Sequence, residues 1–213
     1  MNELTNNEIV LRGRIENVRP SHTIDDIEYY TATMVCKRET MAKDDVLDII
    51  FKKLCYPFSD TDNTNDVTLI GNVRSYSERV GNKNNVSIYV FTYFDKPKEM
   101  YENETNHFKI TGRICKMDDL YVSDKGKKSL HFILANNLVS KGIQTRLNNY
   151  LPCAAWGKLA DKANTFKVGD IITIFGELHS REYKKVIDGE LQLKVAHELY
   201  ITDICTTPSE LKE

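Results

Sequence analysis

The stretch NEIVLRGRI, residues 7–15, returns as NHFKITGRI at residues 106–114. The copies share Asn, Gly, Arg and Ile, and apolar residues occupy the same alternating sites between them. Alternation with a period of two is typical of a strand with one buried face. An internal repeat at a spacing of roughly 100 residues indicates two copies of one small module. We therefore expect two strand-rich domains.

Length and composition agree with two modules. The chain has 213 residues, of which 41% are hydrophobic and 28% are charged, values that are ordinary for globular domains of roughly 100 residues each. No apolar run approaches the roughly 20 residues that span a bilayer. The N-terminal residues MNELTNNEIV lack a basic and apolar leader. We expect a cytosolic protein without membrane contact.

The net charge of −2 is unevenly distributed. Residues 1–105 contain 13 basic and 18 acidic residues, and residues 106–213 contain 16 basic and 13 acidic residues, so the halves carry −5 and +3. Local clustering of cations, more than an overall excess, determines whether a domain binds phosphates. The second half is the better candidate for a polyanion site.

The second copy has a clear order of elements. Residues 106–115, 129–137 and 150–156 are predicted strands, and the composition of residues 158–166 favours a short helix. Residues 170–178 are rich in β-branched side chains, and the last strand, 189–204, follows an Asp188-Gly189 hairpin turn. We interpret the polar stretch between these last two strands as a loop. Three strands, a helix and two strands is the order of the OB-fold, a five-stranded barrel that binds oligonucleotides.

Particular residues make the match more specific. They are Gly112, the step Trp156-Gly157-Lys158-Leu159-Ala160, and the Val168-Gly169 turn leading to Gly176-Glu177-Leu178. With these sites in this order, the second copy closely resembles the bacterial single-stranded DNA-binding protein family over about 95 residues. The resemblance rests on their order, since no single one of these elements is specific.

The first copy fits the same plan more loosely. Its predicted strands are residues 7–15, 28–38, 45–53, 66–76 and 84–94, with Phe51 at the place of Trp156 and Gly71 at that of Gly176. Pro57 and a polar run before Asp66 disfavour the helix there. We predict an all-β protein with a short helix, made of two tandem five-stranded OB-fold barrels: a divergent domain 1–95, a linker 96–105, a second domain 106–205 and a tail 206–213. The short linker predicts close packing of the barrels.

The resemblance implies stacking aromatics at Tyr150, Trp156 and Tyr183. Flat aromatic faces bind unpaired bases without reading their sequence. A further aromatic of the family falls near Ser140, where this chain is polar. The alternative for a lone Trp is a core position, and Tyr150 could simply cover a barrel end.

Cations accompany these aromatics. Phosphate contacts in the second module are predicted for Arg113 and Lys109 on the first strand, Lys125, Lys127 and Lys128 in the first loop, Lys141 and Arg146 in the second, and Arg181 and Lys184 beside Tyr183. Lower-ranked candidates in the first module are Arg12, Arg14, Phe51, Arg74 and Tyr76. The alternative for a Lys-rich turn is a solvated loop.

Catalytic alternatives find little support in the sequence. The five histidines form no HExxH pair and no metal-ligand spacing, and the glycines form no phosphate-binding loop. Five scattered cysteines without a CxxC pair argue against disulfides. We predict no enzymatic activity, no metal and no cofactor.

The leading hypothesis is sequence-nonspecific binding of single-stranded DNA in replication, recombination or repair. Two alternatives stay open, a primosome-like protein-interaction adaptor and an RNA binder, because a fold does not fix a function. The resemblance also implies a homodimer and contacts with replication proteins. The end of the chain, ITDICTTPSELKE, departs from the acidic, aromatic tip by which the family recruits repair enzymes.

Overall fold

A computed structural model describes residues 6–38, 43–53, 66–80, 83–93, 106–139, 146–187 and 190–206. Strands dominate these residues, and the helix α1 (Lys158–Ala163) is short. Within the described ranges, no helix has the length and apolar character needed to cross a membrane.

The first half of the chain closes into a barrel of five strands. These are β1 (Asn7–Ile24), β2 (Ile27–Cys36), β3 (Asp45–Lys52), β4 (Val67–Val80) and β5 (Lys83–Tyr93). Strand β1 pairs with β4 through its first part and with β2 through its second part. The parallel pairing of β3 with β5 completes the ring.

The second half repeats this closure. Its strands are β6 (Asn106–Met117), β7 (Tyr121–Val122), β8 (Lys128–Val139), β9 (Arg146–Trp156), β10 (Ile171–Ile187) and β11 (Glu190–Thr206). Strand β6 pairs with both β10 and β8, and β9 runs parallel to β11. The helix α1 lies between β9 and β10 in the chain, and it buries Ala160 and Ala163. Strand β7 is a short addition at the edge of β8.

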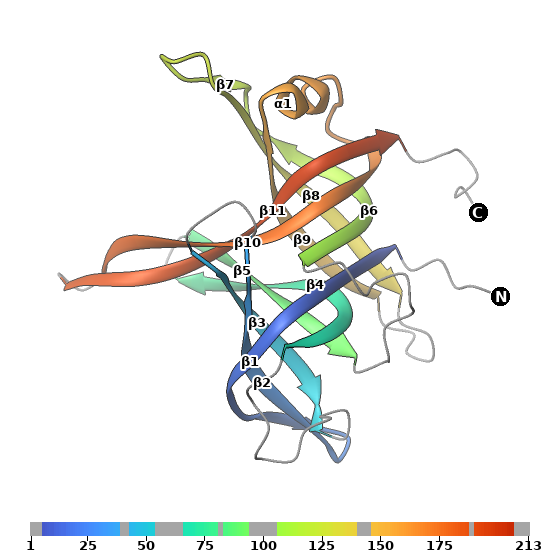
Figure 1. Ribbon diagram of the computed structural model, residues 1–213. Helices are drawn as coiled ribbons and strands as arrows, with labels where there is room; N and C mark the ends of the chain where they lie inside the picture. The colour runs from blue at the N-terminus through green and yellow to red at the C-terminus, as the bar shows by residue number, and fades with distance from the viewer. Residues whose placement is uncertain are drawn as a thin grey trace.

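The two barrels join edge to edge through the repeated sequence itself. Strands β1 and β6 pair antiparallel, with Ile9 opposite Phe108, so that eleven strands form one continuous sheet. Figure 1 shows the barrels stacked one above the other, with the end of the β10–β11 hairpin extending to the side. An antiparallel pair of equivalent strands relates the barrels by an approximate two-fold axis.

The repeated glycine marks the place where the first strand of each barrel changes partner. Gly13 is the last residue of β1 opposite β4, and Arg14 is the first opposite β2. A Cβ at Gly13 would lie 2.0 Å from the carbonyl oxygen of Val35, and one at Gly112 would lie 2.6 Å from that of Ala135. The backbones approach so closely at this corner that only glycine fits.

The repeated asparagine holds the neighbouring strand. The Asn7 amide donates to the Val73 carbonyl at 2.8 Å and accepts from the Val73 N–H at 2.9 Å. Asn106 makes the same pair of bonds to Leu178, at 2.9 and 3.0 Å. Both side chains are buried. A buried amide with satisfied donors and acceptors fixes the pairing without an unmet polar group, which explains why Asn recurs in the repeat.

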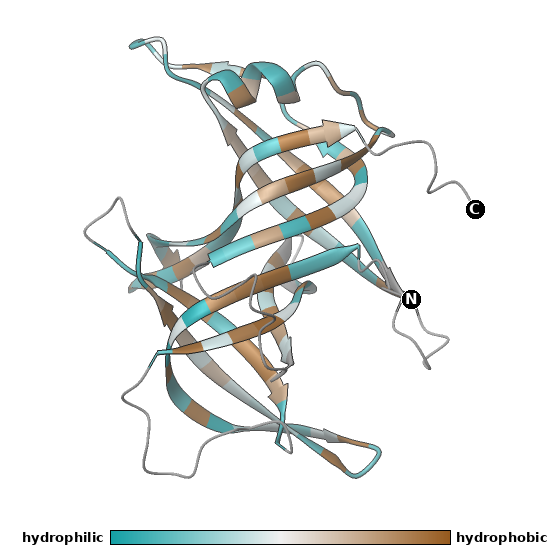
Figure 2. Ribbon diagram, turned by 45° about the vertical axis from the view of Figure 1, so that its right-hand side comes forward, coloured by the Kyte–Doolittle hydropathy of each residue, from teal (hydrophilic) through white to brown (hydrophobic). Residues whose placement is uncertain are grey.

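The core follows the alternation that the sequence predicts. In β6, residues Phe108, Ile110 and Ile114 are buried, whereas Lys109 and Arg113 are exposed. Figure 2 shows the same alternation as stripes of brown and teal along the strands of both barrels. The thiols of Cys36 and Cys153 lie buried in this core.

The structure confirms the predicted fold class of two barrels with a short helix, and it differs from the prediction in several elements. Strand β1 continues beyond the predicted residues 7–15 to Ile24, β9 begins at Arg146 instead of Tyr150, and the edge strand β7 was not predicted. Residues 179–187, interpreted as a polar loop, continue β10 and pair with β11 as far as Ile187. The predicted loss of a helix before Asp66 and the predicted linker concern residues 54–65 and 94–105, which lie outside the described part of the chain. The proposed domain boundaries therefore stay predictions.

Candidate nucleic-acid interface

The outer face of β8 and β9 carries two exposed aromatics on an uncharged surface. Trp156 is 42% exposed and Tyr150 is 46% exposed. Residues opposite each other in an antiparallel pair point to the same side, and the pairs on the side of Trp156 and Tyr150 are Trp156–Ser129, Ala154–His131, Pro152–Ile133, Tyr150–Ala135 and Asn148–Asn137. Ser129 and Ala154 are covered by their neighbours and are themselves buried. We call the ten residues of these pairs the wall. At roughly 3.3 Å per residue, its two aromatics lie about 20 Å apart, a length that admits several nucleotides.

Both ends of the wall extend onto neighbouring strands. Arg113 lies opposite Ala135, which lies opposite Tyr150, so a cation and an aromatic share one row across three strands. The guanidinium of Arg113 also donates to the carbonyl of Gly169. At the other end, Tyr121 of β7 lies opposite Ser129, whose other neighbour is Trp156. His131 packs edge-on to Trp156 at 6.1 Å between ring centroids.

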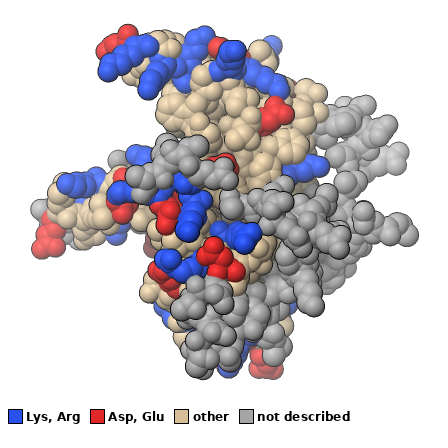
Figure 3. Space-filling model, in the orientation of Figure 1, with Lys and Arg blue, Asp and Glu red and all other residues tan. Residues whose placement is uncertain are grey.

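A basic arm, residues 121–129, projects beside Trp156. Lys125 and Lys127 are exposed on its turn, and Lys128 forms an ion pair with Asp161 of α1 at 2.7 Å. Figure 3 shows the lysine side chains of this arm in blue at the upper left, above a notch in the surface that separates it from the β10–β11 hairpin. The predicted first-loop cations therefore lie next to the wall.

Residues 180–187 of β10 and 190–197 of β11 form a two-stranded ribbon with two unlike faces. Alternation places Tyr183 and Lys185 on one face with Arg181, and it places Lys194 there too because Lys194 lies opposite Tyr183. The guanidinium carbon of Arg181 lies 5.9 Å from the Tyr183 ring centre. The other face bears Val186, Leu191, Leu193 and Val195, all exposed. We call these the basic face and the apolar face.

The base of the ribbon is fastened to the first barrel at Asp45. The Asp45 side chain is 1% exposed. It accepts hydrogen bonds from the Ser180 N–H at 2.6 Å and from Nε of Arg38 at 2.7 Å, and Nδ1 of His179 lies 3.0 Å away. Burial alone would raise the pKa of Asp45, but the hydrogen bonds from Arg38, His179 and Ser180 outweigh it and lower the pKa to about 2.

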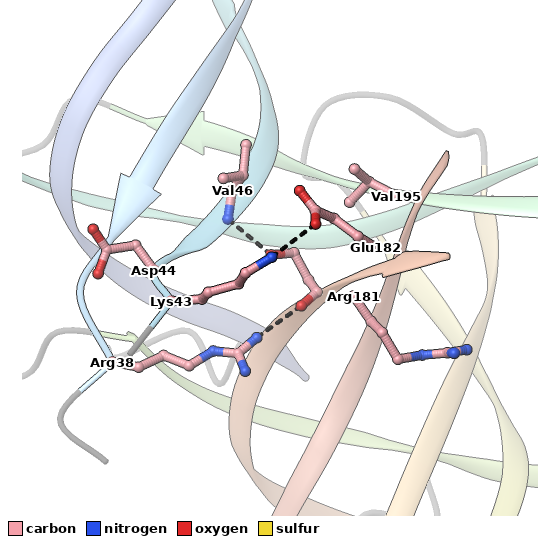
Figure 4. Close-up of a pocket in the computed structure, with 8 residues that line it drawn as sticks. Arg38, Lys43, Asp44, Val46, Arg181, Glu182 and Val195 are labelled. Carbon is pink, nitrogen blue, oxygen red and sulfur yellow. Dashed lines mark hydrogen bonds and ion pairs between the residues drawn. The ribbon is translucent and has the colours of Figure 1, made fainter. Parts of the chain in front are cut away.

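Further contacts surround this carboxylate. The Val46 N–H donates to the Ser180 hydroxyl at 2.9 Å, and Nε2 of His197 lies 2.9 Å from the Val46 carbonyl oxygen. A cavity of about 570 Å³ lies between this part of the first barrel and the ribbon. Figure 4 shows Lys43 and Arg38 reaching across from the first barrel, Lys43 to Glu182 at 2.9 Å, while Arg181 points away from them.

A family model described as "Single-strand binding protein family" matches residues 105–205, the range that contains the wall, the arm and the ribbon. Residues 105–205 belong to the single-strand binding protein family. No curated protein matches the chain.

Solved structures extend the likeness to both barrels. The single-stranded DNA binding protein from Thermus aquaticus, as a deletion mutant, is 15% identical with a TM-score of 0.68, and the match covers 97% of this chain and 98% of that one. Its wild-type form is 13% identical with a TM-score of 0.67, covering 95% and 93%. At this identity the likeness shows a common fold, and it includes the divergent barrel as well as the single-strand binding domain.

The structure corrects the prediction for Phe51. Its side chain is 0% exposed and packs in the core beside Tyr30, so it offers no face to a base. The reason is a register error of one residue. Ser180 contacts Asp45 and Val46 of the first barrel as Ser75 contacts Asn149 and Tyr150 of the single-strand binding domain.

That equivalence assigns every position along the third strand. If Val46 corresponds to Tyr150, then Lys52 corresponds to Trp156, and Phe51 corresponds to the buried Ala155. A slip of one residue moves a strand residue to the opposite face. The first barrel thus has Val46 and Lys52 where the single-strand binding domain has its two aromatics.

The remaining predicted residues divide by position. Lys109 lies between Glu8 and Phe175, with its ammonium 5.8 Å from the Phe175 ring centre. Lys184 lies opposite Leu193 on the apolar face of the ribbon, away from Tyr183, so its predicted grouping with Tyr183 is wrong. Arg146 begins β9, and its side chain, like the whole of Lys141, lies outside the described part.

In the first barrel the candidates are scattered. Arg14 pairs with Glu16 at 3.0 Å, and the guanidinium of Arg74 covers the Phe91 ring at 4.0 Å. Arg12 lies exposed opposite Thr68 of β4, and Tyr76 is exposed beside Tyr89. These side chains form no surface comparable to the wall.

Sequence reasoning missed two residues at the interface. Tyr121 escaped notice because a two-residue strand has no periodicity, although an aromatic just before a Lys-rich turn is a usable signal. Lys194 was read only as part of the last strand, and its place beside Tyr183 appears once the hairpin register is known.

Proposed function

We propose that the protein binds single-stranded DNA without sequence specificity, with bases on the wall and phosphates along the arm and the basic face of the ribbon. The observation that supports this most is the pair Tyr150 and Trp156, exposed on an uncharged strand face inside a single-strand binding domain. Base stacking on aromatics needs flat exposed rings beside cations and tolerates any base.

The charge distribution suits a polyanion that crosses the wall. Arg113 lies in the row of Tyr150. Lys125 and Lys127 lie on the arm, whose base at Ser129 is opposite Trp156, and the ribbon carries Arg181, Lys185 and Lys194. Cations at the edges of the wall attract the phosphate backbone of the DNA, and the uncharged wall between them is then available for contact with the bases. The family and the fold are those of a non-enzymatic DNA-binding protein, and we propose a role in replication, recombination or repair.

A fluorescence titration tests the proposal directly. The chain has one Trp, so quenching by oligo(dT) reports on Trp156 alone. We expect quenching with an affinity whose logarithm falls by about 0.7 per contacted phosphate for each tenfold rise in salt. Absence of both quenching and binding at low salt would contradict the proposal. Competition by oligo(U) measures the preference for DNA over RNA, because a stacking surface by itself scarcely distinguishes the sugar.

Pairing of two chains is a second part of the proposal. The apolar face of the ribbon exposes four large aliphatic side chains in a row, and contiguous apolar surface of this kind is typical of protein contacts. We expect a homodimer by sedimentation equilibrium, and a strict monomer at micromolar concentration would rule it out. Contacts with replication proteins would be detected by copurification.

A further inference from the structure

The first barrel lacks the exposed aromatics of the wall, yet it contacts both elements that carry the stacking residues of the single-strand binding domain. Asp45 and Val46 hold the base of the ribbon, three residues before Tyr183. Ser75 at the other contact accepts the N–H of Tyr150 at 2.8 Å and donates its own N–H to Asn149 at 3.1 Å.

We propose that the first barrel is a brace for the DNA site of the second barrel, and that Asp45 and Ser75 are positioning residues for Tyr183 and Tyr150. This inference rests on the proposed function. Neither residue stacks on a base. Each acts by fixing the backbone from which an aromatic side chain projects.

The contact at Asp45 has the features of a fixed attachment. A buried carboxylate that accepts several hydrogen bonds is costly to displace, because its partners would lose their bonds together. Arg38 also donates to the Ser180 carbonyl at 2.8 Å, so the ribbon backbone is held at both its N–H and its carbonyl. A two-stranded ribbon is marginally stable alone, and an anchored base reduces the conformations open to Tyr183.

Because of the approximate two-fold symmetry, the two barrels contact each other at two equivalent places, but the two contacts differ in their acceptor residues. Each barrel's hairpin reaches the third strand of the other barrel through an equivalent serine, Ser75 or Ser180. At the first barrel the acceptor is the charged Asp45, and at the second it is the neutral Asn149. Both contacts position aromatics of the second barrel, Tyr183 on the ribbon and Tyr150 on the wall, because the first barrel has Val46 and Lys52 in place of the stacking pair.

A double-mutant cycle on the full chain separates positioning from general stability. The variants are Asp45→Ala, Tyr183→Ala and the two combined, each titrated with oligo(dT). We expect Tyr183→Ala to weaken binding by at least about fivefold, Asp45→Ala to weaken it by no more than this, and the double variant to bind like Tyr183→Ala. The inference would be overturned if Asp45→Ala reduced the affinity for oligo(dT) by the same factor in wild type and in the Tyr183→Ala background. It would also be overturned if Asp45→Ala did not change the affinity in either background.

Charge supplies a matched control. Removing a carboxylate increases the electrostatic attraction for DNA. The change in charge alone would therefore raise the affinity of Asp45→Ala, and a loss of affinity must have another cause. Asp48→Ala removes an exposed carboxylate from the same strand, and we expect it to bind at least as tightly as wild type. If Asp45→Ala does not fold, Ser180→Ala replaces it, because that variant removes only the hydroxyl that contacts Asp45 and Val46. Ser75→Ala with Tyr150→Ala forms the parallel cycle for the wall.

Amide hydrogen exchange in the absence of DNA tests the positioning role of the first barrel independently of the proposed DNA binding. We expect faster exchange in residues 181–187 of Asp45→Ala, with the β6 and β8 amides unchanged. Unchanged exchange in the ribbon would contradict the brace, whatever the protein binds. Failure of the wild-type chain to bind oligo(dT), with ribbon exchange altered as expected, would instead contradict the proposed function.

Discussion

At the scale of single residues, the two barrels differ in the side chains on one face of one strand. Tyr150 and Trp156 project outward from β9, and the equivalent places on β3 hold Val46 and Lys52. Aromatic residues are present in the first barrel, but Phe51 points inward and Tyr29 is stacked on His22 with centroids 4.8 Å apart. A stacking surface therefore depends on which side of the strand the rings occupy.

Replacing Trp156 or Tyr150 by Ala should weaken oligo(dT) binding by about 5- to 150-fold each, because a stacked base contributes roughly 1–3 kcal/mol. Thermal unfolding should change little, since both side chains are partly exposed. Anisotropy of a labelled oligonucleotide measures the affinity. Ile24→Ala, an exposed apolar residue at the β1–β2 turn, is the control, and an equal loss there would refute the assignment.

Asp45 should give the protein an acid-sensitive contribution to stability. Its pKa is about 2 in the fold and about 3.9 when unfolded, so ionisation contributes roughly 2–3 kcal/mol to the free energy of unfolding, and this contribution is fully present above the unfolded pKa. That contribution is lost as the pH falls from about 4 through the folded pKa. Urea unfolding at pH 6, 4 and 3 should show the gap between wild type and Asp45→Asn narrowing with acid, and a constant gap would contradict this.

At the scale of elements, the ribbon separates two kinds of surface, and the glycines Gly13 and Gly112 allow the first strand of each barrel to change partner. The ribbon presents a basic face with Tyr183 and an apolar face, and residues adjacent in sequence fall on opposite faces. The first strand of each barrel pairs with one neighbour and then with another, because a glycine lets it turn from one partner to the next.

Lys185 and Lys184 test the two faces of the ribbon with adjacent residues. Lys185→Gln should weaken oligo(dT) binding and reduce the salt slope by about 0.7, because Lys185 shares the face of Tyr183. Lys184→Gln makes the same change of charge on the apolar face and should leave the slope unchanged. Binding isotherms at several salt concentrations give both values. The reverse pattern would place the DNA on the apolar face.

Gly112→Ala should destabilise the second barrel by roughly 1–3 kcal/mol, since the added Cβ must displace a backbone carbonyl. Its nearest neighbours would be the Ala135 oxygen at 2.6 Å and Cγ of Leu134 at 2.8 Å. Gly13→Ala is the counterpart in the first barrel and should behave alike. Urea unfolding measures both, and wild-type stability in either variant would argue against the tight corner.

At the scale of the whole molecule, two barrels of one fold form a unit with a single concentrated interface. The β1–β6 pairing makes the barrels one sheet, and the contacts at Asp45 and Ser75 connect each hairpin to the other barrel. The aromatic and basic surfaces nevertheless gather on the single-strand binding domain.

This distribution predicts the stoichiometry. An OB-fold occupies about 4–16 nucleotides, so an oligo(dT) of about 12 nucleotides should bind once per chain. Native mass spectrometry or a fluorescence titration above the dissociation constant counts the bound strands. Two equivalent strands per chain would mean that the first barrel binds as well as the second.

The sequence by itself determined the duplicated barrel and the aromatics of the wall. Alternation over residues 106–114 showed which side chains are buried, and the ordered motif around Trp156 pointed to two aromatics that the structure places on an exposed strand face. These signals are local, because strand periodicity and turn glycines act over a few residues.

Only the tertiary structure decided three features: the side of β3 on which Phe51 lies, the division of the ribbon side chains between two faces, and the hydrogen bonds from the ribbon to Asp45. Each depends on pairing between residues distant in the chain: the register of β3, the alignment of β10 with β11, and a bond from Ser180 to a carboxylate 135 residues away. A shift of one residue in register reverses every side chain of a strand, and composition and local pattern do not specify that register.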